Sequence, residues 1–577
     1  MNMRVPVALD VVGQTIHPRP CLYPFTPLPL VPYRKVPVRR DLRHLANTPF
    51  DLLIVGAGIY GAAAAWDATE RGWSVALIDR DDFGGGTSFN SAKTIHGGVR
   101  SLQRGRLGEV REYLRERRTL CRILPHLVHR LPFLIPTYRT LPRHRWLLAA
   151  YFAVNDLVAF DRNALPDPSK HLPRSHLISR AECLARHPVI DPTDVTGAMI
   201  WHDCQLYNSD RATLTFVRSA AERGAAAANY VEARSLMVDR GRVCGVRAYD
   251  RLAGEGFEVR ARMVLVAAGP WSETLVRTAS TSRRPLVAAL SRAMNVVVRP
   301  IAEDCAVGGS ARGRLFFLAP WRHVTIAGTS HDPYDAPPET LVARRGDVTS
   351  LLDDLNAAFP GARLTLDDVR LVHRGLLPAQ RDRNVVLLRR SLIRDHHADG
   401  LDGLISMVGV RYTTARHTAE HAVTRAFARA GRRAPASRSA STPLDGGDIP
   451  DVNAFLARGL RDRPTGITES TMRRLLLSYG TRYPELLTMM RRHPELARPL
   501  ARTCDIRRAE IVYAVREEMA MRLADAVLRR TEAGSAGHPG SDALSAAADI
   551  MAQLHGWRDA VRQDEIANVE RLYQVEE

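Results

Sequence analysis

A glycine-rich turn between two short apolar runs constrains the fold of this chain more than any other feature. The apolar run at 52–55 predicts a buried parallel strand, and it continues into GAGIYG at 56–61 and then into an alanine-rich helix. A second apolar run at 75–78 predicts another strand, which ends in Asp79 about twenty residues after the turn. This order of elements is typical of a dinucleotide-binding unit in an α/β fold.

Each residue of this unit has a defined task. Gly56 permits the tight turn, Gly58 lets the backbone approach a pyrophosphate, and Gly61 lets helix and strand pack closely. The pyrophosphate is expected at the helix N-terminus, where unpaired N–H groups point outward. Asp79 is placed to bind a ribose. Because all these features agree, the sequence predicts a nucleotide site rather than a purely structural turn.

A second glycine-rich segment, KTIHGGVR at 93–100, indicates which dinucleotide is bound. Its glycine pair lets the backbone come close to a flat ring, and we expect Lys93, His96 and Arg100 to supply positive charge beside that ring. Cations near a flavin stabilise its reduced form. A nicotinamide dehydrogenase would continue with further strand–helix units, whereas here a polar stretch follows Asp79. FAD is therefore the predicted cofactor, and a nicotinamide enzyme remains the weaker alternative.

The charge balance does not indicate a nucleic-acid partner. The chain has 81 basic and 62 acidic side chains, a net charge of +19, but lysine occurs only at 35, 93 and 170 and the arginines are spread along the sequence. No basic block alternates with stacking aromatics, as single-strand binders require. The seven cysteines are scattered without a CxxC pair, so we expect no metal site and a reducing, cytoplasmic compartment. The N-terminus shows no secretory signal.

Composition divides the chain into four parts. Residues 1–49 are predicted to form an extended or disordered proline-rich arm, and 51–430 the region that binds FAD. Runs at 315–318 and 324–327 are predicted to pair as strands of a sheet in that region. A Gly, Pro and Ser-rich linker is expected at 431–450, followed by a helical C-terminal domain at 451–577 that lacks strands.

One segment suggests contact with a membrane surface. Residues 143–158 place a basic, tryptophan-containing entrance before a short apolar helix, which could lie among lipid headgroups. The alternative is a helix that packs on the protein's own core. No apolar stretch is long enough to span a bilayer. The expected location is the cytoplasm, and this segment adds the possibility of peripheral attachment to the inner face of the cytoplasmic membrane. A homodimer is compatible with the sequence.

These motifs resemble those of the FAD-dependent glycerol-3-phosphate dehydrogenases, within the D-amino-acid oxidase superfamily. The matching residues are TS at 87–88, SAK at 91–93, IHGG at 95–98 and Arg100. Later matches include AAGPW at 267–271, GT at 328–329, TT at 413–414 and YGTRYP at 479–484. The resemblance covers residues 51 to about 531.

The resemblance implies a fold and a reaction. The fold would be α/β, with a Rossmann-like FAD domain of the glutathione-reductase type, an inserted mixed-sheet substrate domain and an all-α C-terminal domain. The reaction would be oxidation of glycerol 3-phosphate, or a related small anionic alcohol, by hydride transfer to flavin N5, with electrons passed to a quinone or another acceptor. Arg100 and Arg411 would bind the substrate anion. The predicted cofactor-binding residues are Gly56, Gly58, Gly61, Asp79, Thr87, Ser88, Lys93, His96, Gly97, Gly98, Val231, Gly269 and Gly409.

Three positions depart from the family pattern. Leu377 replaces a phosphate-binding arginine, Asn295 replaces a histidine and cannot act as a general base, and Ser101 replaces a tyrosine. Arg374, His373 or Arg312 would have to compensate for the lost charge. The departures leave two alternatives open: a different substrate, such as an amine or amino acid, or a flavin-binding protein without catalysis. The general base is not identified by the sequence.

Overall fold

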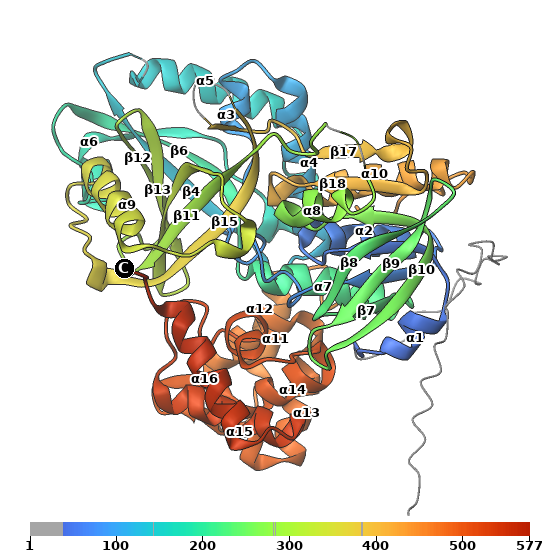
Figure 1. The fold of residues 1–577 in the computed structure, drawn as a ribbon. Helices are drawn as coiled ribbons and strands as arrows, with labels where there is room; N and C mark the ends of the chain where they lie inside the picture. The colour runs from blue at the N-terminus through green and yellow to red at the C-terminus, as the bar shows by residue number, and fades with distance from the viewer. Residues whose placement is uncertain (1–37, 142, 281, 283, 382–384) are drawn as a thin grey trace, which may run out of the picture.

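Two β-sheets stand next to each other above a helical C-terminal region in the computed structural model, which describes residues 38–141, 143–280, 282, 284–381 and 385–577 (Figure 1). The first sheet follows the dinucleotide-binding unit and has the strand order β17-β18-β10-β1-β2-β7. Strands β18, β10, β1, β2 and β7 run parallel, and β17 is antiparallel to β18. These strands are β1 (Phe50–Val55), β2 (Val75–Ile78), β7 (Ala226–Ala228), β10 (Glu255–Val266), β17 (Leu392–Asp395) and β18 (Leu404–Val408).

Three helices cover one face of this sheet, and a small antiparallel layer covers the other. The helices are α2 (Ile59–Glu70), α7 (Ser209–Glu222) and α10 (Ala415–Arg429). On the opposite face lie β8 (Val231–Asp239), β9 (Arg242–Asp250), the first half of β10, and the short helix α8 (Ser272–Arg277). The strands of the parallel sheet read as continuous apolar runs because both of their faces are buried.

The predicted N-terminal arm is only partly described. Residues 1–37 lie outside the described residues. The end of the arm is not extended, because α1 (Leu42–Asn47) is a helix whose Leu45 is fully buried in the core of the antiparallel layer. Asp41 caps this helix by accepting a hydrogen bond from the backbone N–H of His44. Proline content thus predicted an extended chain where a local cap and one buried leucine produce a helical turn.

The second sheet is curled and mixed, with ten strands among the described residues. The predicted pair at 315–318 and 324–327 is confirmed, because these runs lie in β13 and β14, which pair antiparallel. Helix α9 (Arg345–Ala358) covers one face of the sheet. The strands, in spatial order, are β16 (Val385–Leu387), β15 (Val369–Arg381), β11 (Ala289–Val298), β14 (Val324–Tyr334), β13 (Arg314–Trp321), β12 (Ala306–Ala311), β4 (Val128–Tyr138), β6 (Val195–Leu206) and β3 (Thr94–Ile95), with β5 (His176–Ser179) beside β6.

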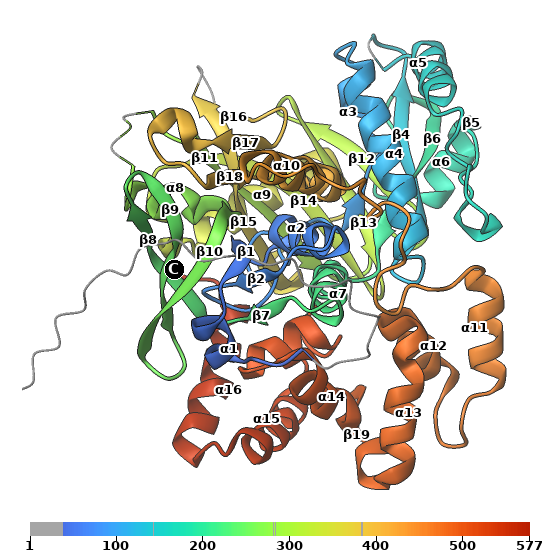
Figure 2. The ribbon, with the colours of Figure 1, turned by 90° about the vertical axis from the view of Figure 1, so that its right-hand side faces the viewer.

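Helices at the β4–β6 end cover the same curled sheet from the other side. They include α5, the segment for which the sequence suggested membrane contact (Figure 2). Among the described residues, no helix has both the length and the apolar character needed to cross a membrane. The helices on this side are α3 (Val99–Leu102), α4 (Leu107–Ile123) and α5 (Arg145–Val158), whereas α6 (Arg180–Arg186) packs on the same side as α9.

The C-terminal region is helical, as the sequence predicted, but it also holds a small hairpin. Strands β19 (Pro499–Ala501) and β20 (Cys504–Arg507) pair antiparallel where the sequence reading expected helices only. Strands this short carry too few residues for a recognisable alternation of apolar and polar positions. The helices are α11 (Val452–Arg461), α12 (Glu469–Tyr479), α13 (Tyr483–Arg492), α14 (Arg508–Glu518), α15 (Ser541–His555) and α16 (Asp559–Tyr573), with a π-helical turn at Asp525–Arg530.

Buried ion pairs join the C-terminal region to the first sheet. The carboxylate of Asp82, which follows β2, bonds Arg529 at 2.6 Å and both terminal nitrogens of Arg530 at 2.7 and 2.6 Å. Asp445 accepts from Arg218 and Arg482, and it belongs to the predicted linker at 431–450. That segment contains no helix or strand, but Asp445 is buried. It is therefore an anchored connection rather than a free tether.

Candidate flavin and substrate site

A cavity of about 1150 Å³ lies where the two sheets meet. It exceeds the range of about 300–1,000 Å³ that is typical of small-molecule pockets, so it offers room for a large cofactor and a second ligand. Twelve of the fifteen predicted site residues line it: Gly56, Gly58, Asp79, Thr87, Ser88, Lys93, His96, Gly98, Arg100, Gly269, Gly409 and Arg411. Gly61, Gly97 and Val231 do not.

The geometry of the first turn fits a dinucleotide. Gly56 has a φ of +99°, and a Cβ there would lie 2.6 Å from the carbonyl oxygen of Ala267. A Cβ on Gly61 would lie 1.8 Å from the carbonyl oxygen of Gly56, so Gly61 acts by letting α2 pack against the turn rather than by touching a ligand. Gly58 precedes the first residue of α2 and faces the cavity. The backbone thus leaves open the space that a pyrophosphate needs.

Asp79 ends β2 at the rim of the cavity, as expected for a ribose-binding acid. Its carboxylate accepts hydrogen bonds from the backbone N–H groups of Ala57 at 2.6 Å and Asp81 at 2.9 Å. Burial raises the pKa of this carboxyl to about 7, because hydrogen bonds from two backbone groups offset only part of the loss of water.

The neighbouring strand β8 forms another wall at this end. Val231 was predicted to touch the cofactor, but it is fully buried, and its backbone N–H bonds the carbonyl of Asp79. The next three residues, Glu232, Ala233 and Arg234, line the cavity instead. No local sequence signal identified them, because their position depends on the pairing of β8 with β9 and on its contact with the end of β2.

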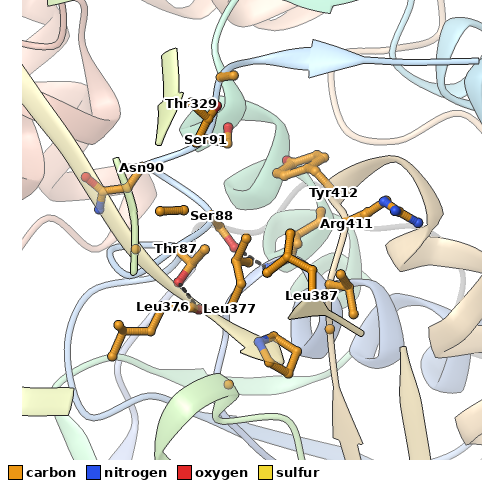
Figure 3. A pocket seen from close by; sticks show the side chains of 18 of the residues that line it. Thr87, Ser88, Asn90, Ser91, Thr329, Leu376, Leu377, Leu387, Arg411 and Tyr412 are labelled. Atoms are coloured by element: carbon orange, nitrogen blue, oxygen red, sulfur yellow. Dashed lines mark hydrogen bonds between the residues drawn. The ribbon is translucent and has the colours of Figure 1, made fainter. Parts of the chain in front are cut away.

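The middle of the cavity is bounded by tight contacts around Thr87 and Ser88. The Ser88 hydroxyl accepts from the N–H of Ile59 at 3.0 Å, and the Thr87 hydroxyl donates to the carbonyl of Leu376 at 3.2 Å (Figure 3). A Cβ on Gly409 would lie 2.0 Å from the ring of Tyr60. The start of α2, the segment at 87–88 and the chain at Gly409 therefore approach each other closely. Larger side chains at these positions would close the space for a flat ring.

Two of the predicted cations do not act as expected. His96 is neutral, because burial and the nearby Arg411 and Arg100 lower its pKa to about 3, so the prediction that His96 supplies positive charge is wrong. Lys93 is completely buried, and its Nζ donates to the carbonyl of Phe89 and to the Ser209 hydroxyl. The ammonium of Lys93 is therefore held by protein groups.

Gly97 has a structural task. Its N–H donates to the Asp203 carboxylate at 2.7 Å, and Asp203 also bonds the buried Arg117. A Cβ on Gly97 would lie 2.7 Å from the Arg117 guanidinium. The glycine pair is thus held against a buried ion pair, which fixes the path of the chain between His96 and Arg100.

Positive charge collects at the far end of the cavity, around Arg100. Its guanidinium donates to the carbonyl of Leu315 at 3.4 Å, and within the described ranges it forms no ion pair with a carboxylate. Burial, Arg104 and Arg411 lower its pKa. Arg104 and Arg314 also line this end. A site with several cations and a guanidinium that has no carboxylate partner in the described structure is suited to an anionic ligand.

The Arg411 guanidinium is held by other protein groups. It bonds the Tyr113 hydroxyl and the carbonyl of Arg389, and Figure 3 shows it directed away from the other labelled side chains. It borders both the main cavity and a smaller neighbouring one of about 290 Å³. In this arrangement Arg100 is the better placed of the two predicted anion-binding arginines.

The three positions that depart from the family pattern, Leu377, Asn295 and Ser101, all line the cavity. Leu377 and Leu387 line the cavity on the paired strands β15 and β16 (Figure 3). Asn295 is buried, and its Oδ1 accepts from Thr329 at 2.6 Å. Ser101 is also buried and lines the cavity.

The three residues proposed to compensate for Leu377 do not border the cavity. Arg312 pairs with Asp354 at 2.9 Å, and the Arg374 guanidinium donates to the carbonyl of Leu341. His373 is fully buried between the rings of Phe89 and Trp321. None of these three side chains therefore supplies the charge that the family pattern would place at 377.

Comparison with known proteins identifies relatives of the whole chain. A family model described as FAD dependent oxidoreductase matches residues 51–433, and one described as C-terminal domain of alpha-glycerophosphate oxidase matches residues 437–562. A glycerol-3-phosphate dehydrogenase of Synechocystis is 28% identical over 535 residues, which cover 90% of this chain and 95% of that protein. The mitochondrial glycerol-3-phosphate dehydrogenase of Macaca fascicularis is 30% identical over 575 residues, which cover 94% of this chain and 76% of that protein.

A solved structure agrees with this similarity. The glycerol-3-phosphate dehydrogenase from Bacillus halodurans, complexed with FAD, superimposes with a TM-score of 0.73 at 25% sequence identity. The match covers 92% of this chain and 95% of that one. The predicted α/β fold and the predicted FAD cofactor are thereby confirmed.

Proposed function

We propose a function on the premise that the chain belongs to the family of FAD-dependent oxidoreductases and is similar to the glycerol-3-phosphate dehydrogenases within it. It oxidises the secondary hydroxyl of glycerol 3-phosphate or of a related small anionic alcohol. The observation that supports this proposal most is the cavity that runs from the glycine turn to Arg100, whose guanidinium lines the cavity without a carboxylate partner in the described part of the chain.

The residues of the cavity divide the work. Gly56, Gly58 and Asp79 would hold the ADP half of FAD, and the backbone around Thr87 and Gly409 would hold its ring. When bound, FAD supplies a two-electron acceptor at N5, which takes the carbinol hydrogen as a hydride while the hydroxyl loses its proton and becomes a ketone.

The protein's own groups would orient the substrate and take up its proton. Arg100 would bind the substrate anion and so place its carbinol carbon in the cavity. A proton acceptor is available at His331, which lines the same end of the cavity. It is neutral, because burial and Arg100 lower its pKa to about 4.

Anaerobic reduction of the purified, FAD-loaded protein tests the proposal. Glycerol 3-phosphate should bleach the flavin absorbance, and the Arg100→Ala variant should require far more substrate for the same rate. If glycerol 3-phosphate leaves the flavin oxidised while a hydroxy acid or an amino acid reduces it, the reaction type remains but the default substrate is wrong.

A second candidate is a flavin-binding protein without catalysis, which the substituted positions favour. Asn295 accepts a hydrogen bond from Thr329 and offers no basic nitrogen, and Leu377 has no charge. The double variant Leu377→Arg with Asn295→His would gain activity towards glycerol 3-phosphate if the pocket has only been altered. Turnover of any substrate by the wild-type chain would eliminate this candidate.

Electron transfer to a quinone at the inner face of the cytoplasmic membrane completes the proposal. Helix α5 exposes Trp146 (65%) and Leu157 (74%), and Phe160 (75%) follows directly. Arg143 and Arg145 at its start could pair with anionic headgroups. A variant with serine at the three apolar positions should no longer float with vesicles that contain anionic lipid. Val561→Ser, which changes an exposed residue on α16, is the matched control.

A further inference from the structure

The flavin cavity continues past Arg100 into an apolar chamber that small anions such as glycerol 3-phosphate would not fill. Seven largely apolar side chains form its walls: Phe133 and Ile135 on β4, Leu148, Tyr151 and Phe152 on α5, Trp201 on β6 and Phe317 on β13. All of them border the same cavity as the glycine turn and Arg100. The chamber is thus an extension of the substrate end rather than a separate void.

The alternation of the strands explains why apolar side chains gather there. On β13, Phe317 and Ala319 face the chamber, whereas Phe316 and Leu318 pack under α9 on the other face of the sheet. The indole ring of Trp201 stacks on Phe133 with centroids 5.3 Å apart. These aromatic contacts hold the walls in place around the space that the cavity occupies.

Charge is arranged in a gradient along the cavity. Arg100, Arg104 and Arg314 border the cavity where the chamber begins, and the apolar Leu377 and Leu387 border it from β15 and β16. Beyond the arginines the chamber walls carry no charged side chain among the described residues that line it, apart from Asp203, which is paired with Arg117. A ligand that fills this space needs an anionic group beside an apolar one.

Helix α5 separates this chamber from the outside. Leu148 and Phe152 face inward, whereas the adjacent Leu147 is 47% exposed. The hydroxyl of Tyr151 donates to the carbonyl of Val99, which ties α5 to the segment that carries Arg100. The helix that exposes apolar side chains to the surroundings is therefore also a wall of the substrate end.

We propose that the substrate is an anionic secondary alcohol that carries a short apolar chain, of the type of a 1-O-alkyl glycerol 3-phosphate. The anion binds at Arg100, the free hydroxyl is oxidised as proposed above, and the chain lies in the chamber between α5 and β13. The inference rests on the proposed oxidation of an anionic alcohol and adds only what the substrate carries at its other end.

A homologous series of substrates measures occupation of the chamber. Each methylene buried in an apolar site contributes about 0.8 kcal/mol, a factor of about four. The rate of anaerobic flavin reduction per unit of substrate concentration should therefore rise about 60-fold from 1-O-methyl to 1-O-butyl glycerol 3-phosphate. The FAD-loaded full-length protein is used, and glycerol 3-phosphate is the reference.

Matched variants locate the effect. Leu148→Trp fills the chamber from α5 and should lower the butyl-to-methyl ratio below about tenfold, whereas Leu147→Trp, its exposed neighbour, should keep the wild-type ratio. Ala319→Leu fills the chamber from the sheet and guards against a folding defect in Leu148→Trp. Flavin content after gel filtration shows that each variant is folded.

The outcomes separate this inference from the proposed function. Equal rates for glycerol 3-phosphate and both 1-O-alkyl ethers would overturn the chamber inference and leave the proposed function intact. No flavin reduction by any of the three would refute the proposed function itself. If Ala319→Leu slows reoxidation by a short-chain quinone but leaves the butyl-to-methyl ratio unchanged, the chamber holds the electron acceptor and the inference is wrong.

Discussion

Arginines gather in two regions of this protein, and only one of the regions pairs them with carboxylates. At the boundary with the C-terminal helices, Arg529 and Arg530 are both bonded to Asp82. At the end of the flavin cavity, Arg100 is exposed and has one long hydrogen bond to a carbonyl. A cavity-lining guanidinium without a carboxylate partner among the described residues is available to bind an anionic ligand.

Two carboxyl groups at the end of β2, Asp79 and Asp82, show the same contrast. Asp82 faces the boundary, where Arg530 and Arg529 outweigh the effect of burial and hold its pKa below the ordinary value. Asp79 faces the cavity, where burial raises its pKa to about 7. Charged groups at the boundary are therefore paired within the protein, whereas those at the cavity are available to pair with a ligand.

The strongest way to test the structural half of this comparison is Asp82→Ala. It removes the carboxylate between two buried guanidiniums, and breaking a buried pair in this way costs about 3–5 kcal/mol. The free energy of unfolding, measured by urea denaturation, should fall by that amount. Glu258→Gln, which removes an exposed ion pair with Arg260, should change it by less than about 1 kcal/mol. Equal losses in the two variants would contradict the assignment.

Gly56→Ala tests whether the cofactor end depends on backbone geometry rather than charge. Left-handed backbone costs a non-glycine residue about 1–3 kcal/mol, and here the new Cβ would also press on the carbonyl of Ala267. We expect the purified variant to lose most of its flavin. Gly72→Ala has a similar φ of +84° but open space around the Cβ, so it should retain FAD, as absorbance at the flavin band would show.

Arg100→Ala should separate activity from stability. Loss of a charge-assisted contact of about 1.5–3 kcal/mol predicts a fall in kcat/KM of about 10- to 150-fold. Because Arg100 has no carboxylate partner in the described structure, the free energy of unfolding should stay the same or rise. Arg100→Lys should keep part of the activity. A loss of stability comparable to that of Asp82→Ala would show that Arg100 is a structural residue.

The smallest expected effect is a pH dependence that arises from Asp79. In the folded protein this carboxyl keeps its proton up to about pH 7, whereas in the unfolded chain it loses it near 3.8. The folded state therefore binds more protons between these values, and stability of the FAD-free protein should decrease as pH rises through this window. Asp79→Asn should remove that decrease. A wild-type profile identical to that of the variant would contradict the raised pKa.

Local patterns predicted the cofactor half of the candidate site well. Gly56, Gly58 and Asp79 lie where the strand–turn–helix pattern placed them, because the geometry of one βαβ unit is set by contacts within about thirty residues. The prediction that His96 is charged was wrong because its protonation depends on distant residues. Its surroundings include Arg411, more than three hundred positions away, and neither that contact nor the burial of the ring is visible in the local pattern.

The substrate half depended on long-range pairing. Val231 was expected at the cofactor, but the register of β8 presents Glu232, Ala233 and Arg234 instead. The chamber residues come from β4, α5, β6 and β13, and each reads locally as an ordinary core position. An apolar residue that lines a cavity has the same sequence pattern as one that fills a core.

By itself, the amino-acid sequence determined the α/β class and the flavin cofactor. These properties follow from glycine spacing and apolar runs, whose consequences are local. Only the tertiary structure decided which arginines are paired, that His96 is neutral, and that α5 closes an apolar chamber beside Arg100. Such properties depend on which distant side chains share a space without water, and burial rather than residue type sets their charge and role.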